Sequence, residues 1–311
     1  MAKKVILDMD PGVDDALAII LALKSPEVEV LGITTVAGNV KVEKTTANAL
    51  KVVELLDREV PVVPGFHKPL LRRLETAVHF HGADGLGDSN LPLPKLRVQK
   101  GHAVDFLEKT VLEHPSRTID LVATGPLTNV AIALLKSPDL GKRLNQIVSM
   151  GGAFRLTKYG HGNCSQVAEF NIYCDPEAAR IVYSSTVKRV AVGLDVTANP
   201  QNCLNRELLR KIDESQNKTG KFAKKILRKW IVTGHNFQLH DPLAVAVSID
   251  PSLVRCEDYP VLVETSGEVA RGQTIIDRTN KTEQPSTSSI CVDVDSDKFL
   301  KLVMGRIANG P

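Results

Sequence analysis

Apolar runs rich in β-branched residues alternate with stretches of helical spacing over most of the chain. The predicted strand and helix segments follow one another at residues 4–8, 14–24, 28–36, 41–56, 118–124, 127–136, 146–150, 175–185 and 189–197. The strand-like runs are apolar at consecutive positions, so both of their faces must be buried, as in a parallel sheet that helices cover on both sides. The pattern therefore predicts an α/β fold built on an open, mostly parallel sheet.

The remaining segments complete this prediction without indicating a second domain. Residues 16–23 are apolar almost all round, so the first helix should be buried on most sides. Residues 206–230 are helical and lysine-rich, which predicts a solvent-facing subregion beside the ligand site that the acidic residues described below indicate. Residues 259–267 and 271–279 predict an antiparallel hairpin at the sheet edge near the C-terminus, and residues 295–307 predict a closing helix. We therefore expect a single domain over residues 1–311.

Composition limits the classes of partner and the cellular compartment that we expect. Lysine and arginine number 39 against 36 aspartates and glutamates, a net charge of +3 with no long run of one sign, so neither nucleic acid nor a membrane is an expected partner. The apolar run at the start is too short for the core of a signal peptide, and we expect a cytoplasmic protein. The five cysteines are widely spread and never form a C-x-x-C, which argues against a disulfide framework and a thiolate zinc site.

The first turn after a predicted strand is unusually acidic. Asp8, Asp10, Asp14 and Asp15 fall within eight residues, with Pro11 and Gly12 between them. A helix start with extra acids facing the helix dipole would explain one or two of these residues. Four carboxylates at one turn favour a ligand site, in which Asp8 has either a supporting or a direct role.

Other polar residues follow the later predicted strands or lie in apolar surroundings. These are Asn39, Thr124, Met150 and Asp195 at strand ends, and Asn163, Glu169, Asn171, His240 and Asp241 in two further segments. Because ligands gather outside the carboxyl ends of parallel strands, we expect these residues to meet at one rim. Two simpler explanations stay open: His81 in "HFHG" can be a solvated loop residue, and "HD" at 240–241 can merely start a helix before Pro242.

Carboxylates brought together in this way raise one another's pKa unless a cation lies among them. Asp10, Asp15, Asp241 and a main-chain carbonyl near Thr124 would form an all-oxygen set, which suits Ca²⁺ or Mg²⁺ rather than zinc. Calcium accepts about 6 to 8 oxygens, so positions would remain for a water and for two vicinal hydroxyls. A sugar diol fits that description.

Taken together, the sequence resembles the inosine-uridine-preferring nucleoside hydrolases, which cleave the N-glycosidic bond of ribonucleosides. "DMDPGVDDALA" fits the D-x-D-x-G-x-D-D pattern of that family, and "VAGN", "TGPLTNVA", "MGGAF", "AEFNIYCDPEAA", "GLDVT", "HDPLAVA" and "RGQTIID" follow in the family's order. The resemblance covers nearly the whole chain. It implies the nucleoside hydrolase fold, one bound Ca²⁺, and a homodimer or homotetramer.

The resemblance also implies a role for each matching residue. Asp10, Asp15, Asp241 and the carbonyl of Thr124 would hold the Ca²⁺, and Asp10 would take a proton from a Ca²⁺-bound water. The ribose would be held by Asp14, Asn39, Met150, Asn163, Glu169 and Asn171. His240 would assist departure of the base, and His81 matches a histidine that some pyrimidine-preferring members use. Family members often place tyrosines before "HD", where this chain has Trp230, His235 and Gln238.

Two functions from other classes remain as alternatives. A strand that ends in D-x-D also opens Mg²⁺-dependent phosphatases of the haloacid-dehalogenase type, in which Asp8 would be the nucleophile. A Ca²⁺-dependent sugar- or nucleoside-binding protein would need the ligands but no carboxylate that acts as a base. Release of phosphate distinguishes the first alternative, and binding of ribose without release of base distinguishes the second.

Overall fold

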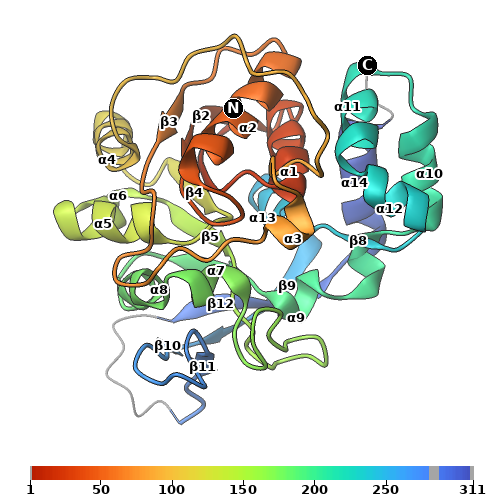
Figure 1. Cartoon of the computed structure of the whole chain (residues 1–311). Helices are drawn as coiled ribbons and strands as arrows, with labels where there is room; N and C mark the ends of the chain where they lie inside the picture. Colours follow the sequence, from red (N-terminus) through yellow and green to blue (C-terminus); the bar gives the residue numbers. More distant parts are fainter. Residues whose placement is uncertain (1, 280–286, 309–311) are drawn as a thin grey trace.

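The computed structural model describes residues 2–279 and 287–308, and its central element is an eight-stranded sheet (Figure 1). The strand order is β3-β2-β1-β4-β5-β6-β12-β9, and only the pair β12–β9 is antiparallel. The strands are β1 (Lys3–Met9), β2 (Val28–Thr35), β3 (Val62–Pro64), β4 (Ile119–Ala123), β5 (Gln146–Met150), β6 (Arg189–Val192), β9 (Val254–Tyr259) and β12 (Ser288–Val294). The predicted open, mostly parallel sheet is confirmed.

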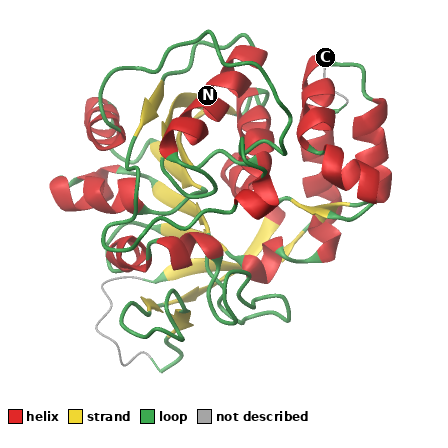
Figure 2. Cartoon of the chain, in the orientation of Figure 1, coloured by secondary structure: helices red, strands yellow, loops and turns green. Residues whose placement is uncertain are grey.

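Helices cover both faces of this sheet (Figure 2). Alternate side chains of β1 enter different hydrophobic clusters, with Val5 and Leu7 on one face and Ile6 on the other. The first cluster includes residues of α1 (Val13–Leu23), α2 (Val42–Leu55), α13 (His240–Ile249) and α14 (Ser296–Ile307). The second includes residues of α4 (Ala103–Glu113), α5 (Thr128–Lys136), α6 (Leu140–Arg143) and α8 (Pro176–Tyr183). The molecule therefore has two hydrophobic cores, one on each face of the sheet.

The first helix is buried along its whole length, as its sequence predicts. Every residue of α1 is buried, because the helix packs on the sheet and is surrounded by α2, α13 and α14. Leu17 and Ile20 are fully buried, and burial of each such side chain stabilises the fold by about 1.5–3 kcal/mol relative to exposure. This packing fixes the start of α1, where Asp14 and Asp15 lie.

The sheet grows first on one side of β1 and then on the other side of it. From β1 the chain adds β2 and β3 on one side, and it then crosses to add β4, β5 and β6 on the other side. The segments that leave β1 and β4 therefore diverge, which opens a crevice at the carboxyl ends of these two strands. Asp10 follows β1 and Thr124 follows β4, so both residues lie at this point.

Two local predictions differ from the structure. The hairpin is present as β10 (Val261–Val263) and β11 (Thr274–Ile276), but it forms a separate two-stranded sheet, and β9 occupies the edge of the main sheet. The strand-like run at 189–197 ends at Val192, and Leu194–Thr197 forms the short helix α9. The cause is a tertiary contact, because the Asp195 side chain accepts backbone N–H groups of residues 154, 156 and 157 in the loop after β5.

The lysine-rich region folds into three helices beside α14 (Figure 1). These are α10 (Arg206–Glu214), α11 (Lys218–Ile226) and α12 (Arg228–Thr233), flanked by the short antiparallel strands β7 (Cys203–Leu204) and β8 (Phe237–Gln238). The other short helices are α3 (Val78–His81), α7 (Phe170–Cys174) and the 3₁₀ turns Pro200–Asn202 and Pro251–Leu253. Within the described parts of the chain, no helix is both long and apolar enough to cross a bilayer.

Candidate functional site

A cavity of about 430 Å³ opens at the carboxyl ends of the central strands. Its lining includes most of the residues that the sequence predicts for the site, namely Asp14, Asn39, His81, Thr124, Met150, Asn163, Glu169, Asn171, His240 and Asp241. Asp10 and Asp15 do not line it, and both are fully buried. The structure thus brings the predicted residues together, with two of the carboxylates behind the cavity wall.

The carboxylates come from three separate parts of the chain. Asp10 follows β1, Asp14 and Asp15 lie in the first turn of α1, and Asp241 lies in the first turn of α13. One oxygen from each of Asp14, Asp15 and Asp241 lies within 4.8 Å of the others. The compact group therefore contains Asp14, whereas Asp10 lies next to it and is coupled to Asp15 by charge.

Burial and mutual repulsion disfavour the ionised form of these aspartates. Burial, followed by the neighbouring aspartates, raises the pKa of Asp10 and of Asp241 well above the usual value. The same causes raise the pKa of Asp14 to about 7, and burial raises that of Asp15. Among the residues that the structure describes, Oδ1 of Asp10 and Oδ1 of Asp14 have no hydrogen-bond partner. Buried oxygens without donors, all on carboxylates, form a donor set that suits a hard divalent cation.

Hydrogen bonds hold two of the carboxylates in place. The backbone N–H of Asn39 donates to Oδ2 of Asp10 (2.7 Å), and its side-chain amide donates to Oδ2 of Asp15 (3.1 Å). Asp15 also accepts from the Gly12 N–H (2.9 Å) and from the Thr124 hydroxyl (2.8 Å). The simple helix-start explanation is therefore partly right, since Asp15 caps α1, but its other oxygen is held by the loop after β4.

Glu169 and Asn171 connect the ends of β4 and β5. Glu169 accepts backbone N–H groups of Asn171, Ile172 and Gly152, so it caps α7 and also holds the turn after β5. The Asn171 amide donates to the carbonyl oxygens of Thr124 (2.7 Å) and Met150 (3.2 Å). Its own Oδ1 is therefore the atom that is left to accept a hydrogen bond from a ligand.

The two predicted histidines are built into the cavity wall. His81 is only 6% exposed and accepts the Val13 N–H at Nδ1 (3.1 Å), so the explanation as a solvated loop residue is wrong. Burial, followed by the charges of His240 and His79, lowers the pKa of His81 to about 3. Burial lowers the pKa of His240 to about 4, and its Nδ1 lies 2.8 Å from the Thr197 hydroxyl. Both imidazoles are neutral at pH 7.

Like Asp10 and Asp15, two other acidic residues singled out in the sequence, Asp8 and Asp195, lie outside the cavity lining. Asp8 is fully buried and accepts the Thr34 hydroxyl (2.6 Å) and the Asn129 amide (2.8 Å). A phosphatase nucleophile must face the substrate, so this placement argues against the phosphatase alternative. Asp195 holds the segment that leads to Asn163, through the backbone N–H groups described above.

Several residues of the site were not found from the sequence. These residues, which also line the cavity, are Glu75, Thr76, Ala77, His79, Phe80, Cys164 and Phe170. Of the residues in place of the family's tyrosines, Gln238 alone is in this lining, while Trp230 packs on Phe80 and Phe237, and His235 is exposed. Four of the missed residues, Glu75, Thr76, Ala77 and Cys164, lie on long connections, where no strand end predicts their position. "HFHG" was the available signal for His79 and Phe80.

Known proteins match the chain over its whole length. The family model described as inosine-uridine preferring nucleoside hydrolase matches residues 5–301. The inosine-uridine preferring nucleoside hydrolase of Crithidia fasciculata is 39% identical over 315 residues, which cover 99% of this chain and 98% of that protein. The pyrimidine-specific ribonucleoside hydrolase RihA of Citrobacter koseri is 40% identical over 318 residues, with 99% of each chain covered. A solved plant nucleoside hydrolase, the PpNRh1 enzyme, covers 100% of both chains with a TM-score of 0.92 at 35% identity.

Proposed function

The chain belongs to the inosine-uridine preferring nucleoside hydrolase family, and from that premise we propose that it splits ribonucleosides into ribose and free base with one Ca²⁺ ion. Hydrolysis of the N-glycosidic bond of ribonucleosides is the activity of the family. The metal, the roles of the residues and the assembly are the proposed part. The observation that carries the proposal is the buried carboxylate cluster beneath a cavity of about 430 Å³.

The donor set fits a calcium ion. Asp10, Asp15, Asp241 and the carbonyl of Thr124 would hold it, and Asp14 lies close enough to share the charge. All of these donors are oxygens, and no cysteine or histidine belongs to the compact group found among the described residues. When bound, Ca²⁺ would keep the carboxylates ionised and would make a coordinated water more acidic.

Asp10 is the candidate general base. Its Oδ2 is fixed by the Asn39 N–H, whereas its Oδ1 has no partner among the described residues and is therefore free to take a proton from the attacking water. As the glycosidic bond stretches, the ribose gains positive charge. The carboxylates of Asp14 and Asp241 at the cavity floor stabilise that charge more strongly than they stabilise the neutral ground state.

The ribose is held by polar groups with spare acceptors. Asp14 and Asn39 line the cavity beside the carboxylate cluster, where they would bind the 2′ and 3′ hydroxyls. Asn171 offers its Oδ1, since its side-chain N–H groups donate to the Thr124 carbonyl and to the carbonyl and sulfur of Met150. Glu169, Asn163 and the main chain around Met150 complete the contacts to the sugar.

The base would depart toward the histidine wall. His240 is the proposed proton donor, and the hydrogen bond between its Nδ1 and Thr197 fixes the orientation of the ring. His81 accepts at Nδ1, so in the neutral ring the proton lies on Nε2, which can donate to the leaving base. Donation by neutral imidazole becomes favourable as the departing base gains negative charge.

Release of free base from inosine, adenosine, uridine and cytidine tests the proposal. The purified protein should hydrolyse at least one of them, lose this activity after treatment with a chelator, and recover it with Ca²⁺. Binding of nucleosides without release of base would favour the non-catalytic binding alternative instead. We also expect a homodimer or homotetramer, which light scattering coupled to size exclusion measures.

A further inference from the structure

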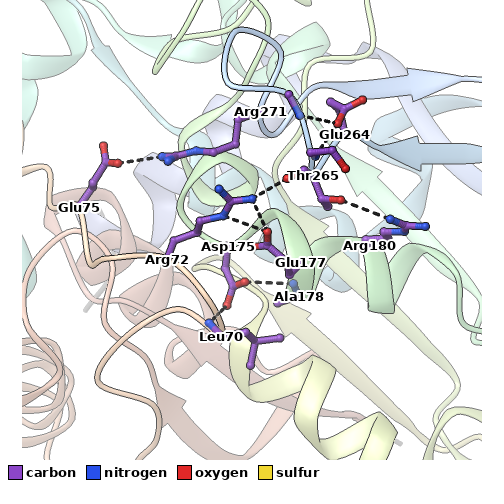
Figure 3. A network of polar contacts seen from close by, with 12 residues as sticks. Leu70, Arg72, Glu75, Asp175, Glu177, Ala178, Arg180, Glu264, Thr265 and Arg271 are labelled. Atoms are coloured by element: carbon purple, nitrogen blue, oxygen red, sulfur yellow. Dashed lines mark hydrogen bonds and ion pairs between the residues drawn. The ribbon is translucent and has the colours of Figure 1, made fainter.

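One wall of the cavity is formed by the end of a long connection, residues 65–77, between β3 and α3. Figure 3 shows how this β3–α3 segment is fastened to distant parts of the fold. The Leu70 N–H donates to Asp175 (3.0 Å), Arg72 pairs with Glu177, and Glu75 pairs with Arg271 (2.8 Å). These contacts fix the position of Glu75, whose side chain is 50% exposed at the cavity.

The stretch from residue 75 to residue 81 runs along the cavity between two anchors. At one end, the Cys174 thiol of α7 donates to the Glu75 carbonyl (3.8 Å). At the other end, the Val13 N–H of α1 donates to His81 (3.1 Å). Glu75 therefore lies on the α7 side of the cavity, whereas His81 lies on the α1 side.

The orientation of a nucleoside follows from these two sides, and this step rests on the proposed function. The base at C1′ and the 5′ group at C4′ flank the ring oxygen, so with the 2′ and 3′ hydroxyls on the carboxylates these two groups extend toward opposite ends of the cavity. A base directed toward His81 and His240 leaves the 5′ group near Glu75 and Cys164. Partial desolvation, and then the charges of Glu75 and Glu169, raise the pKa of Cys164 to about 11, which agrees with their proximity.

The charges near the expected position of the 5′ group disfavour a negatively charged 5′ group. Among the described residues that line the cavity there is no lysine or arginine, and Glu75 adds a carboxylate to those of Asp14, Glu169 and Asp241. The nearby cation is Arg271, which is only 16% exposed. Its guanidinium lies 3.6 Å from the centre of the Tyr173 ring and donates to Glu75, so its charge is already used within the protein.

We infer that Glu75 is a specificity-determining residue that restricts the site to nucleosides with an uncharged 5′ group. In the pair of Glu75 and Arg271 the carboxylate is the partner that lines the cavity, so a 5′-phosphate meets the carboxylate first. The same pairing occupies Arg271, which could otherwise attract the phosphate. A phosphomonoester carries about −1.5 to −2 charges at pH 7, so at the 5′ position it meets the carboxylate of Glu75, with that of Glu169 nearby. Nucleoside 5′-monophosphates are therefore excluded.

The test compares uridine with uridine 5′-monophosphate, and inosine with inosine 5′-monophosphate, by release of free base. Glu75→Gln keeps the shape of the side chain but removes its charge and releases Arg271. We expect the ratio of kcat/KM for the nucleotide to that for the nucleoside to rise at least tenfold. Glu75→Ala should change the ratio in the same direction, and Glu75→Asp, which keeps the charge, should not.

Two further variants separate this explanation from a general loosening of the segment. Glu177→Gln weakens the other ion pair of the segment, away from the cavity, and should leave the ratio unchanged. Adding Arg271→Gln to Glu75→Gln should remove most of the gain. An unchanged ratio in Glu75→Gln and Glu75→Ala, with nucleosides still hydrolysed, would overturn the inference alone. Failure of the wild-type protein to hydrolyse any nucleoside would overturn the proposed function, and this inference with it.

Discussion

The substitution Gly38→Ala tests whether the Asp10 carboxylate must keep its position for catalysis. A Cβ at this residue would meet Oδ2 of Asp10 well inside the 3.0 Å limit that real Cβ atoms respect, and it would also crowd Pro126 at 2.8 Å. Gly38 is not among the glycines with a positive φ, so alanine is not strained by the backbone itself. The substitution Gly38→Ala therefore acts mainly by moving the Asp10 carboxylate.

The size of the effect follows from that contact. The carboxylate must move by roughly 1 Å, and a displacement of this size in a reacting group can lower the rate by about 100-fold. The move also weakens the hydrogen bond from the Asn39 N–H to Asp10, and a bond to a charged group contributes about 1.5–3 kcal/mol. We expect kcat of Gly38→Ala to fall by about 100-fold or more, with KM for the nucleoside changed much less.

The assay is steady-state release of free base, together with thermal unfolding in the presence and absence of Ca²⁺. Gly305→Ala is the matched control, because a Cβ there meets nothing within 4 Å and the residue lies inside α14. The control should leave kcat unchanged and stabilise the fold by about 0.5–1 kcal/mol. A folded Gly38→Ala protein with wild-type kcat would refute the assignment of Asp10 as a base that must be held in place.

Three further predictions concern single side chains. Asp10→Asn should leave the fold intact and lower turnover by several orders of magnitude in the base-release assay, and near-wild-type activity would contradict its role. His240→Ala should slow nucleosides far more than p-nitrophenyl riboside, whose leaving group needs little protonation, and equal losses would remove His240 as the proton donor. Hydrogen bonds from Lys298 and Ser252 lower the pKa of Asp250 to about 2, below its usual 3.8, so its stabilising effect is present above pH 4 and disappears as the pH falls to 2. Denaturation of Asp250→Asn should therefore show a small loss of stability at pH 7, and the same loss at pH 2 would contradict this.

The parts of the site that follow strands could be predicted, because the strand pattern itself predicts where the chain turns. Asn39 and Thr124 come after a buried apolar run and Met150 ends one, and parallel strands bring their carboxyl ends to one edge. The roles of these residues stay predictions, but their convergence is a property of the fold. The sequence order alone was sufficient for that.

The parts that depend on tertiary contacts could not be predicted. Glu75 reaches the cavity through the fastening of the β3–α3 segment, which depends on partners about a hundred or more residues away. β12 has a mixed burial pattern and pairs with both β6 and β9, so its apolar positions do not alternate regularly. The place of the β10–β11 hairpin depends on packing against α8, which no local pattern encodes.

The acidic cluster lies where the fold can best tolerate it. Asp14 and Asp15 are in the first turn of α1, Asp241 is in the first turn of α13, and the two helices pack side by side. The positive ends of both helix dipoles therefore point at the same carboxylates, and each such contact is worth about 0.3–1 kcal/mol at an exposed site and up to about 2 when partly buried. These contributions are smaller than the cost of several buried charges, as the raised pKa values of the cluster indicate. The first turns of the two helices thus place the carboxylates together at the crevice between β1 and β4. A cation is still needed to keep all of them ionised.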